Sequence, residues 1–453
     1  ISRDRTLRLN SRSPGARSTT TNVKASSVAT HNATCNNATR EAYGKNLFPA
    51  LNVQMDVIRR GVSEIIPEDD LSRKIERSIA TRTPLNVKLG CDPSRPDLHL
   101  GHSVVLRKLR QFQDLGHQAI LIIGDFTGMI GDPSGKSRTR PSLSLEETRL
   151  NGQTYFEQAT KVLSAKNISM FYNSEWLGKM GFADVVRLAS KYTVARMLER
   201  DDFTIRYKAG EPIGVHEFLY PLAQAMDSVA IKADVELGGT DQKFNLLVGR
   251  DIQREYGLEP QVALTMPILV GTDGVEKMSK SLDNCIGVSE SPRDMYGKTL
   301  RIPDGLIVPY FELTTDVSNA ELVAIRKELA SGANPRDLKR RLARSIVALY
   351  HSEVDARSAE EEFDRIFIQK SLPDEVEEIT LAGDQVPPTI LALLSQTKLA
   401  ASNSDARRRI EHGGVTIDGE KVSNPLAPIP AVTEFIVKVG KRRFLKVLIA
   451  PRS

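Results

Sequence analysis

Two histidines near residue 100 could handle the phosphates of a nucleotide. His99 and His102 enclose Gly101 at a point where the chain is expected to leave a strand and enter a helix. The first turn of a helix offers free backbone N–H groups and the positive end of the helix dipole, which favour a phosphate. Gly101 would also let a flat base approach the backbone. Taken alone, the pair is as compatible with half a metal site or with a helix cap, although no third metal ligand follows at a suitable spacing.

A second group of candidate residues lies far downstream. Lys277 and Lys280 belong to the run Lys-Met-Ser-Lys-Ser at 277–281, directly after a glycine turn. Two ammonium groups on a loop can neutralise a pyrophosphate as it leaves. A lone lysine pair is usually solvated surface. His-x-Gly-His followed by Lys-Met-Ser-Lys-Ser, however, resembles the paired signature of class I aminoacyl-tRNA synthetases.

The elements that would position these groups are a strand, a helix and a second strand. Apolar residues alternate over 85–89, recur with helical spacing over 102–112, and run together over 119–123. A strand, a helix and a strand in this order form a parallel pair with a crossover. We therefore predict an α/β fold with a doubly wound, Rossmann-like parallel sheet. The glycine-rich segment Gly131–Ser137 is not a P-loop, because three rather than four residues separate its glycines.

The chain is long enough for several folding units. We predict a disordered presequence over 1–50, the catalytic domain over 51–300 after a helical lead-in at 57–80, a helical domain over 301–385, and a small basic α+β domain over 386–453. The three cysteines form no CxxC pair, which indicates neither a disulfide framework nor a zinc site. No run approaches the roughly 20 apolar residues that a membrane span needs.

Charge is concentrated at the two ends of the chain. The net charge is +5, but residues 1–50 hold eight Lys and Arg against two acids, and residues 387–453 hold eleven against five. The N-terminal stretch is also rich in Ser, Thr and Asn and has no apolar periodicity. This composition favours a mitochondrial or chloroplast transit peptide, with an ordinary disordered tail as the alternative. The basic C-terminal end suggests contact with a polyanion.

From Val87 to about Val288 the chain resembles the tyrosyl-tRNA synthetases. The resemblance is carried by Thr127–Gly135, by Tyr220-x3-Gln224-x2-Asp227, and by Gly238–Gln242. It implies tyrosine contacts from Thr127, Asp132, Tyr220, Gln224, Asp227, Gln242 and Lys88. It implies ATP contacts from Asp92, Gly101, Gly239, Asp241, Met278 and Ser279, and stabilisation of phosphate charge by His99, His102, Lys136, Lys277 and Lys280.

The spacing of the tyrosine contacts agrees in part with this resemblance. Tyr220, Gln224 and Asp227 would share one face of a helix, although Pro221 must then lie near the first turn or at a kink. A surface helix face is the alternative. Lys88 is a departure, because many members of the family have a tyrosine at this position, and Lys88 could instead pair with an acid in the strand region.

The C-terminal end resembles the S4-type RNA-binding module. Asp405–Ile410 would form a helix, followed by one hairpin turning at Asp418-Gly419 and another near Gly440. We expect phosphate contacts from Arg407, Arg408, Arg409, Lys421, Lys441 and Arg442. A basic but inert cap is the alternative.

The resemblance implies a tyrosine–tRNA ligase that uses ATP with Mg²⁺ as substrate, binds tRNA(Tyr), needs no protein-bound metal, and forms a homodimer. The helical domain would then bind the anticodon. With a transit peptide, the enzyme would work in the mitochondrial matrix, the chloroplast stroma, or both. A tryptophan-specific relative and a synthetase-derived RNA-binding or splicing protein are the alternatives.

Overall fold

The computed structural model describes residues 48–92, 98–131, 145–367, 376–383, 385–430, 432–440 and 443–450. Four predicted site residues lie outside these ranges, namely Asp132, Lys136, Lys441 and Arg442, as does nearly all of the predicted presequence. None of the helices in the described ranges is long and apolar enough to cross a membrane.

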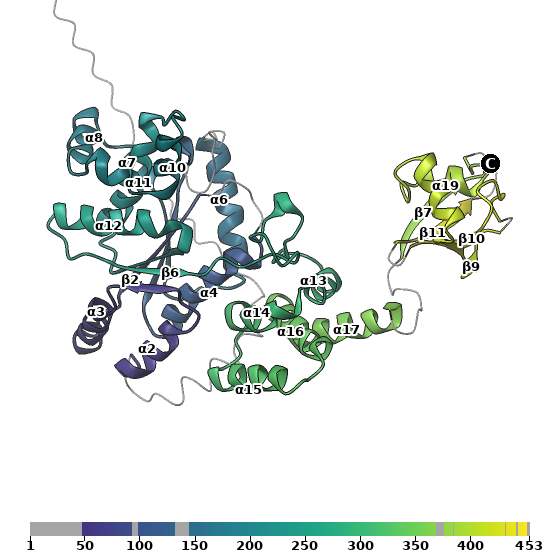
Figure 1. The fold of residues 1–453 in the computed structure, drawn as a ribbon, viewed down its shortest axis with the longest axis horizontal. Coiled ribbons are helices and arrows are strands. Elements are labelled where there is room, and N and C mark those ends of the chain that lie inside the picture. Colours follow the sequence, from purple (N-terminus) through teal and green to yellow (C-terminus); the bar gives the residue numbers. More distant parts are fainter. Residues whose placement is uncertain are drawn as a thin grey trace, which may run out of the picture. The chain divides into compact units, whose positions relative to one another are not determined.

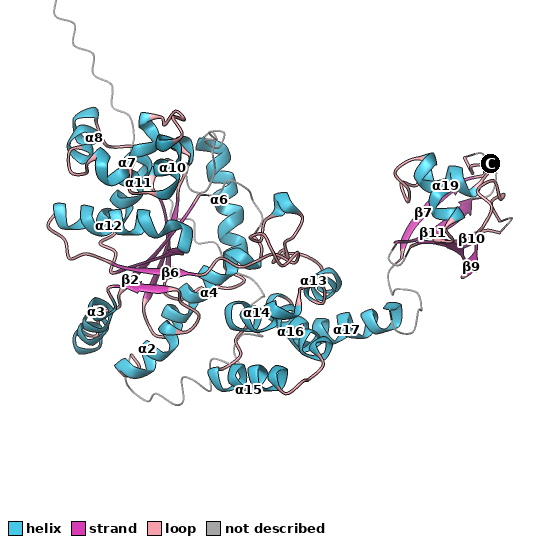
Figure 2. Ribbon diagram, in the orientation of Figure 1, coloured by secondary structure: helices cyan, strands magenta, loops and turns pink. Residues whose placement is uncertain are grey.

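A six-stranded sheet forms the centre of the first large part of the chain (Figures 1 and 2). Its strand order is β1-β6-β5-β2-β3-β4, and all pairs are parallel except β1 with β6. The strands are β1 (Glu64–Ile66), β2 (Asn86–Cys91), β3 (Gln118–Ile123), β4 (Ile168–Tyr172), β5 (Val235–Gly239) and β6 (Val262–Met266). The predicted doubly wound sheet is confirmed. The chain order reverses between β2 and β5, which is where ligands bind in open α/β sheets.

The crossover between β2 and β3 is α4 (Leu100–Asp114), as the helical spacing predicted. The four inner strands β6, β5, β2 and β3 are mostly buried, as expected for a parallel sheet covered on both faces, whereas the edge strands β1 and β4 are only partly buried. The predicted lead-in helix is instead two helices, α2 (Leu51–Arg59) and α3 (Glu68–Thr81), separated by β1. Gly61 at φ +65° turns the chain after α2, and Pro67 cannot continue a helix.

A buried lysine joins α4 to α2. Lys108 is 2% exposed, and its ammonium group donates to the carbonyl oxygens of Val57 (3.1 Å), Ile58 (2.8 Å) and Arg60 (2.8 Å) at the end of α2. These carbonyls have no partner within their own helix, and a cation there also complements the helix dipole. Lys108 therefore fixes the middle of α4 to the C-terminal end of α2.

Between β3 and β6 the chain forms a run of helices and the two further strands. The helices are α5 (Thr127–Ile130), α6 (Leu145–Ala159), α7 (Ser174–Leu177), α8 (Phe182–Ala189), α9 (Val194–Met197), α10 (Asp201–Lys208), α11 (Val215–Ala230), the 3₁₀ turn η1 (Thr240–Gln242) and α12 (Lys243–Glu255). Among these, α11 carries the predicted tyrosine contacts and packs along α12.

The predicted helical region follows the catalytic sheet. Within 301–385 the described helices are η3 (Asp304–Leu306), α14 (Ile307–Thr314), α15 (Asn319–Ala330), α16 (Pro335–Tyr350) and α17 (Glu353–Phe367), and they are preceded by η2 (Lys280–Leu282) and α13 (Pro292–Thr299). Its buried residues belong to the same apolar cluster as the sheet. The basic face of α16 is largely neutralised, since Arg340 binds Asp364 at 2.6 Å and Arg344 binds Glu360 at 3.0 Å.

The C-terminal part has its own sheet and its own apolar core. It contains β7 (Glu377–Ala382), α18 (Ile390–Gln396), α19 (Asn403–Glu411), β8 (Val415–Ile417), β9 (Glu420–Lys421), β10 (Glu434–Val439) and β11 (Arg443–Ala450), in sheet order β7-β11-β10-β8-β9. The predicted helix and both predicted hairpins are present. The predicted boundary at 385/386 is wrong, because β7 pairs in parallel with β11 and so belongs to this sheet.

Candidate active site

The two histidines form the start of α4. His99 is the N-cap, and its Nδ1 accepts a hydrogen bond from the backbone N–H of Gly101 at 3.1 Å. The Nδ1 of His102 accepts from the backbone N–H of His99 at 3.3 Å, and the two ring centroids are 3.9 Å apart. The histidines therefore do cap the helix. No group of three or more His, Cys, Asp or Glu side chains that could hold a metal ion occurs among the residues described.

Burial sets the charge of both rings, and the capping hydrogen bonds set which ring nitrogen carries the proton. Burial lowers the pKa of His99 to about 3, helped by the charges of His102 and Lys280, and burial together with the charge of Lys280 lowers the pKa of His102 to about 4. Both rings are thus neutral at pH 7. Because each Nδ1 accepts a hydrogen bond, the single ring proton must be on Nε2. Each histidine can therefore donate one N–H from Nε2 without carrying a charge.

The loop that carries Lys277 and Lys280, here called the lysine loop, packs with the residues that follow it against the start of α4. Leu100 N donates to Ile286 O at 2.9 Å, and His99 forms a β-bridge with Gly287. Met278 is buried, and a Cβ added to Gly101 would lie 3.5 Å from its Cβ, so the backbone of Gly101 runs directly beneath Met278.

The loop itself is held by its own hydrogen bonds. Asn284 accepts from the backbone N–H of Ser279 at 2.7 Å and donates to the carbonyl of Lys277 at 3.1 Å. The side chain of Lys277 is exposed, and Lys280 lies close enough to both histidines to depress their pKa values. The structure thus brings the two signatures together, although about 180 residues separate them in the sequence.

The ends of β2 and β5 bring further predicted residues to the same edge of the sheet. Asp92 follows β2 and accepts hydrogen bonds from Thr127 Oγ1 at 2.9 Å and from the hydroxyl of Tyr220. Gly239 ends β5, and the exposed Asp241 follows it in η1. A side chain at Gly239 would place its Cβ 2.6 Å from an oxygen of Asp241. The structure places Asp92, Gly239 and Asp241 at this one edge of the sheet, and their contact with a nucleotide stays a prediction.

Tyr220, Gln224 and Asp227 share one face of α11, as predicted, and this face is buried. Tyr220 is 5% exposed, Asp227 is 3% exposed, and Gln224 between them is partly buried, which excludes the alternative of a surface face. Pro221 lies inside the helix, beyond its first turn. Gln224 and Gln242 are linked through Asn245, whose Nδ2 lies 3.1 Å from the side-chain oxygen of each.

Asp227 has two partners that the sequence reading missed. Trp176 Nε1 donates to Asp227 Oδ1 at 2.9 Å, and Asn173 Nδ2 donates to Oδ2 at 3.5 Å. Burial raises the pKa of Asp227 to about 7 against the opposing charge of Lys88. A signal did exist, since Asn173 directly follows β4 at the same edge of the sheet and Trp176 is the chain's one tryptophan.

Lys88 corrects the predicted contact with the substrate phenol. Its side chain is fully buried and forms an ion pair with Glu236 of β5 at 2.9 Å. Its ammonium group also donates to Gln224 O at 3.0 Å and Ser228 Oγ at 2.8 Å. An ammonium group has three hydrogens to donate, and these three partners use all of them. Lys88 therefore pairs with an acid in the strand region, Glu236, which was the alternative prediction.

The predicted RNA contacts lie on two elements of the C-terminal part. Arg407 and Arg408 of α19 are exposed, as is Lys421 of β9. Arg408 and Arg409 both bind Asp405, at 2.7 Å and 2.8 Å, which holds two guanidinium groups on one side of the helix. Their role in RNA binding stays a prediction.

The fold and the joined signatures define a class I aminoacyl-tRNA synthetase, which is an aminoacyl-tRNA ligase. Residues 80–368 match the family model "tRNA synthetases class I (W and Y)", and residues 390–426 match the S4 domain. The tyrosine–tRNA ligase of Salinibacter ruber is 56% identical over 403 residues, covering 88% of this chain and 97% of that protein. That of Chlorobium chlorochromatii is 58% identical over 401 residues, covering 88% of this chain and 99% of that protein.

Among solved structures, the tyrosyl-tRNA synthetase of Archaeoglobus fulgidus complexed with L-tyrosine has the same fold, with a TM-score of 0.57. It is 24% identical and covers 68% of this chain and 99% of its own. The chain therefore belongs to the class I synthetase family of the tryptophan and tyrosine enzymes and, within that family, to the tyrosyl-tRNA synthetases.

Proposed function

We propose that this chain activates L-tyrosine with ATP, presented as its magnesium complex, and transfers it to tRNA(Tyr) inside an organelle. The observation that carries the choice of tyrosine is the buried carboxyl group of Asp227, which shares a helix face with Tyr220 and Gln224. A hydroxyl-bearing side chain could donate a further hydrogen bond to this carboxyl group beside those from Trp176 and Asn173, whereas phenylalanine could donate none. The curated relatives, which are tyrosine–tRNA ligases over nearly their full length, support the same choice.

The chemistry would consist of two substitutions. In the first, the tyrosine carboxylate attacks the α-phosphorus of ATP, and the bond to pyrophosphate breaks. The Nε2–H groups of His99 and His102 and the ammonium groups of Lys277 and Lys280 would stabilise the charge that develops on the phosphates. In the second, a hydroxyl of the terminal tRNA ribose attacks the tyrosyl carbonyl and AMP leaves. Catalysis would rest on positioning and electrostatics, without a covalent enzyme intermediate.

The neutral state of the histidines suits this role. With its proton on Nε2, the neutral ring can donate to a phosphate oxygen, and this hydrogen bond does not depend on pH above about 5 because the protonation state of the ring does not change there. The ammonium group of Lys280 supplies the positive charge beside the two rings. This division leaves the histidines to orient the triphosphate and the lysines to balance its charge.

The test is tyrosine-dependent exchange of pyrophosphate into ATP. We expect tyrosine alone to support exchange when tyrosine, tryptophan and phenylalanine are compared at equal concentration. Exchange with tryptophan in place of tyrosine would favour the tryptophan-specific alternative. No exchange with any of the three would favour an RNA-binding protein that has lost activation.

A homodimer is the second part of the proposal. Large apolar side chains stand exposed on α8, α9, α10 and the start of α11, at Phe182 (86%), Val186, Val194, Ile205, Tyr207 and Val215. The last two helices are joined by the edge-to-face pair Phe203 and Phe218 at 4.9 Å. Exposed apolar side chains in such number mark an interaction surface. We expect Phe182→Glu with Ile205→Glu to convert a dimer to a monomer in sedimentation, while a dimer that persists would contradict this surface.

Import into an organelle is supported by the composition of residues 1–50 alone. The segment combines six net positive charges with many hydroxyl side chains, as transit peptides do. We expect residues 1–50 to direct a fluorescent reporter into mitochondria, chloroplasts or both. As a control, Arg3, Arg5 and Arg8 are replaced by Gln, which should leave the reporter outside. A reporter that stays in the cytosol with the native segment would end this part of the proposal.

A further inference from the structure

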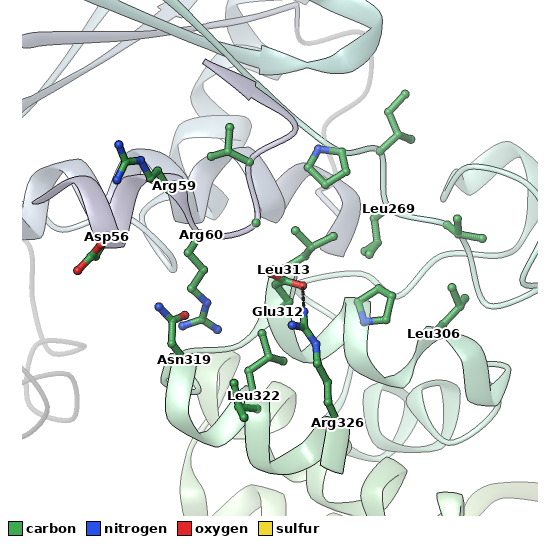
Figure 3. A pocket seen from close by; sticks show the side chains of 17 residues that line it. Asp56, Arg59, Arg60, Leu269, Leu306, Glu312, Leu313, Asn319, Leu322 and Arg326 are labelled. Atoms are coloured by element: carbon green, nitrogen blue, oxygen red, sulfur yellow. Dashed lines mark hydrogen bonds and ion pairs between the residues drawn. The ribbon is translucent and has the colours of Figure 1, made fainter. Parts of the chain in front are cut away.

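A cavity of about 710 Å³ is lined by none of the predicted site residues, although its wall includes Leu269, whose carbonyl oxygen accepts a hydrogen bond from the backbone N–H of Met278. It is bounded by the end of α2, by the segment that follows β6, and by α14 and α15 (Figure 3). Its walls are mainly apolar and include Val62, Leu269, Leu313, Leu322 and Val323. A volume of this size lies within the roughly 300–1,000 Å³ typical of small-molecule sites.

One guanidinium group in this cavity lacks a partner. Arg60 follows α2, and its Nε and Nη2 are shielded from solvent with no hydrogen-bond partner among the described residues. Burial lowers its pKa, although the charges of Glu312, Asp316 and Glu321 oppose the shift. Each of these acids has another partner: Glu312 binds Arg326 at 3.0 Å, Asp316 binds Arg107, and Glu321 accepts a hydrogen bond from Ser318 Oγ at 2.8 Å. A half-buried cation without a counter-ion is costly, and an incoming anion would reduce that cost.

The neighbouring arginines differ from Arg60 in this respect. Arg59 also lines the cavity, but its side chain is exposed and bonds to Glu68 at 2.6 Å. Arg326 is held by Glu312. Arg60 extends toward Asn319 and Leu322 in the same view. Arg60 is therefore the charge that this cavity offers to a ligand.

We propose that the cavity binds a small organic carboxylate with an apolar body. The carboxylate pairs with the guanidinium of Arg60, whose planar donors match its two oxygens. The apolar body packs against Leu313 and Leu322, where it displaces water from apolar walls. The site is distinct from the one proposed for tyrosine, since none of the residues assigned to tyrosine lines it.

The probe is octanoate, titrated calorimetrically into the full chain without tyrosine, ATP or tRNA. We expect saturable binding of octanoate and at least about tenfold weaker binding of octanol, which lacks the charge, and of acetate, which lacks the apolar body. Octylammonium should not bind. Equal binding of octanoate, octanol and octylammonium, or the absence of saturable octanoate binding, would overturn the proposal. Because no substrate of the ligase reaction is present, either result is independent of the proposed function.

Two matched variants locate the site. Arg60→Met keeps most of the side-chain volume and should weaken octanoate at least about tenfold, whereas Arg59→Met, one residue away, should leave it unchanged. Val323→Glu adds a negative charge at an exposed lining position and should also weaken it. An unchanged urea unfolding midpoint in all three shows that the variants are folded. Equal losses in Arg60→Met and Arg59→Met would mean general charge attraction and would refute the assignment of Arg60.

Discussion

Replacing Lys88 by methionine tests whether this residue supports the tyrosine pocket through a buried ion pair. Lys88 and Glu236 are 0% and 1% exposed, so water cannot replace either partner. Without the lysine, Glu236 keeps hydrogen bonds from Gln224, Ser228 and Gln261 but loses its counter-charge. Removing one partner of a buried pair costs about 3–5 kcal/mol. We expect Lys88→Met to lose that much stability, and Lys88→Met with Glu236→Gln to regain most of it, because no charge is then left unpaired.

The assay is urea unfolding followed by the fluorescence of Trp176, which lies against Asp227 and so reports on this region. Lys74→Met is the control, since Lys74 is also buried at 1% but its acid partners, Asp234 and Glu259, are 21% and 54% exposed and can be hydrated. Its loss should be smaller. The reasoning is refuted if Lys88→Met unfolds at the wild-type urea concentration yet loses tyrosine affinity that Glu236→Gln does not restore. That result would mean direct contact with the substrate.

Two further predictions concern the site itself, and a third concerns three buried histidines, of which His117 is not a site residue and bonds to Gln54 at 2.8 Å. Lys280→Met should lower kcat for tyrosine activation by roughly 10²–10³ with a much smaller change in tyrosine binding, and equal losses in single-turnover rate and binding would count against its role. Asp227→Asn should lower kcat/KM for tyrosine by roughly ten- to a hundredfold and narrow the preference over phenylalanine, so an unchanged preference would disprove phenol recognition by this residue. Burial lowers the pKa of His99 to about 3 and of His102 and His117 to about 4, from 6.5. Between pH 4 and 6.5 the unfolded chain therefore binds more protons, and the free energy of unfolding should fall as the pH falls through this window, which urea unfolding at several pH values would detect.

Much of the fold and of the site could be predicted because the signals are local. Alternating apolar residues followed by apolar residues at helical spacing predicted β2 and α4. The spacing of Tyr220, Gln224 and Asp227 predicted that they share one helix face. The approach of the lysine loop to His99 was predicted from resemblance, since no property of either segment alone identifies the other as its neighbour.

The features that were missed depend on contacts between distant residues. Lys88 and Glu236 are about 150 residues apart, and only the pairing of β2 with β5 places them together. The strand β7 carries two adjacent acids and lies more than 60 residues before β11, so local patterning gave it no sheet partner. Trp176 was not predicted as a site residue because a single tryptophan forms no repeating pattern that would assign it to a helix face or a strand face.

The three hydrogen bonds of Lys108 hold in place the helix that begins at His99 and His102 of the candidate active site. The buried amino group of Lys108 donates to three carbonyl oxygens at the end of α2. A shift of α4 along its axis would break these hydrogen bonds at a place where water cannot replace them, so α4 resists such a shift. The histidine side is thereby anchored. If the site closes around the triphosphate, we therefore expect the movement in the segment bearing Lys277, whose side chain is exposed, and not in α4.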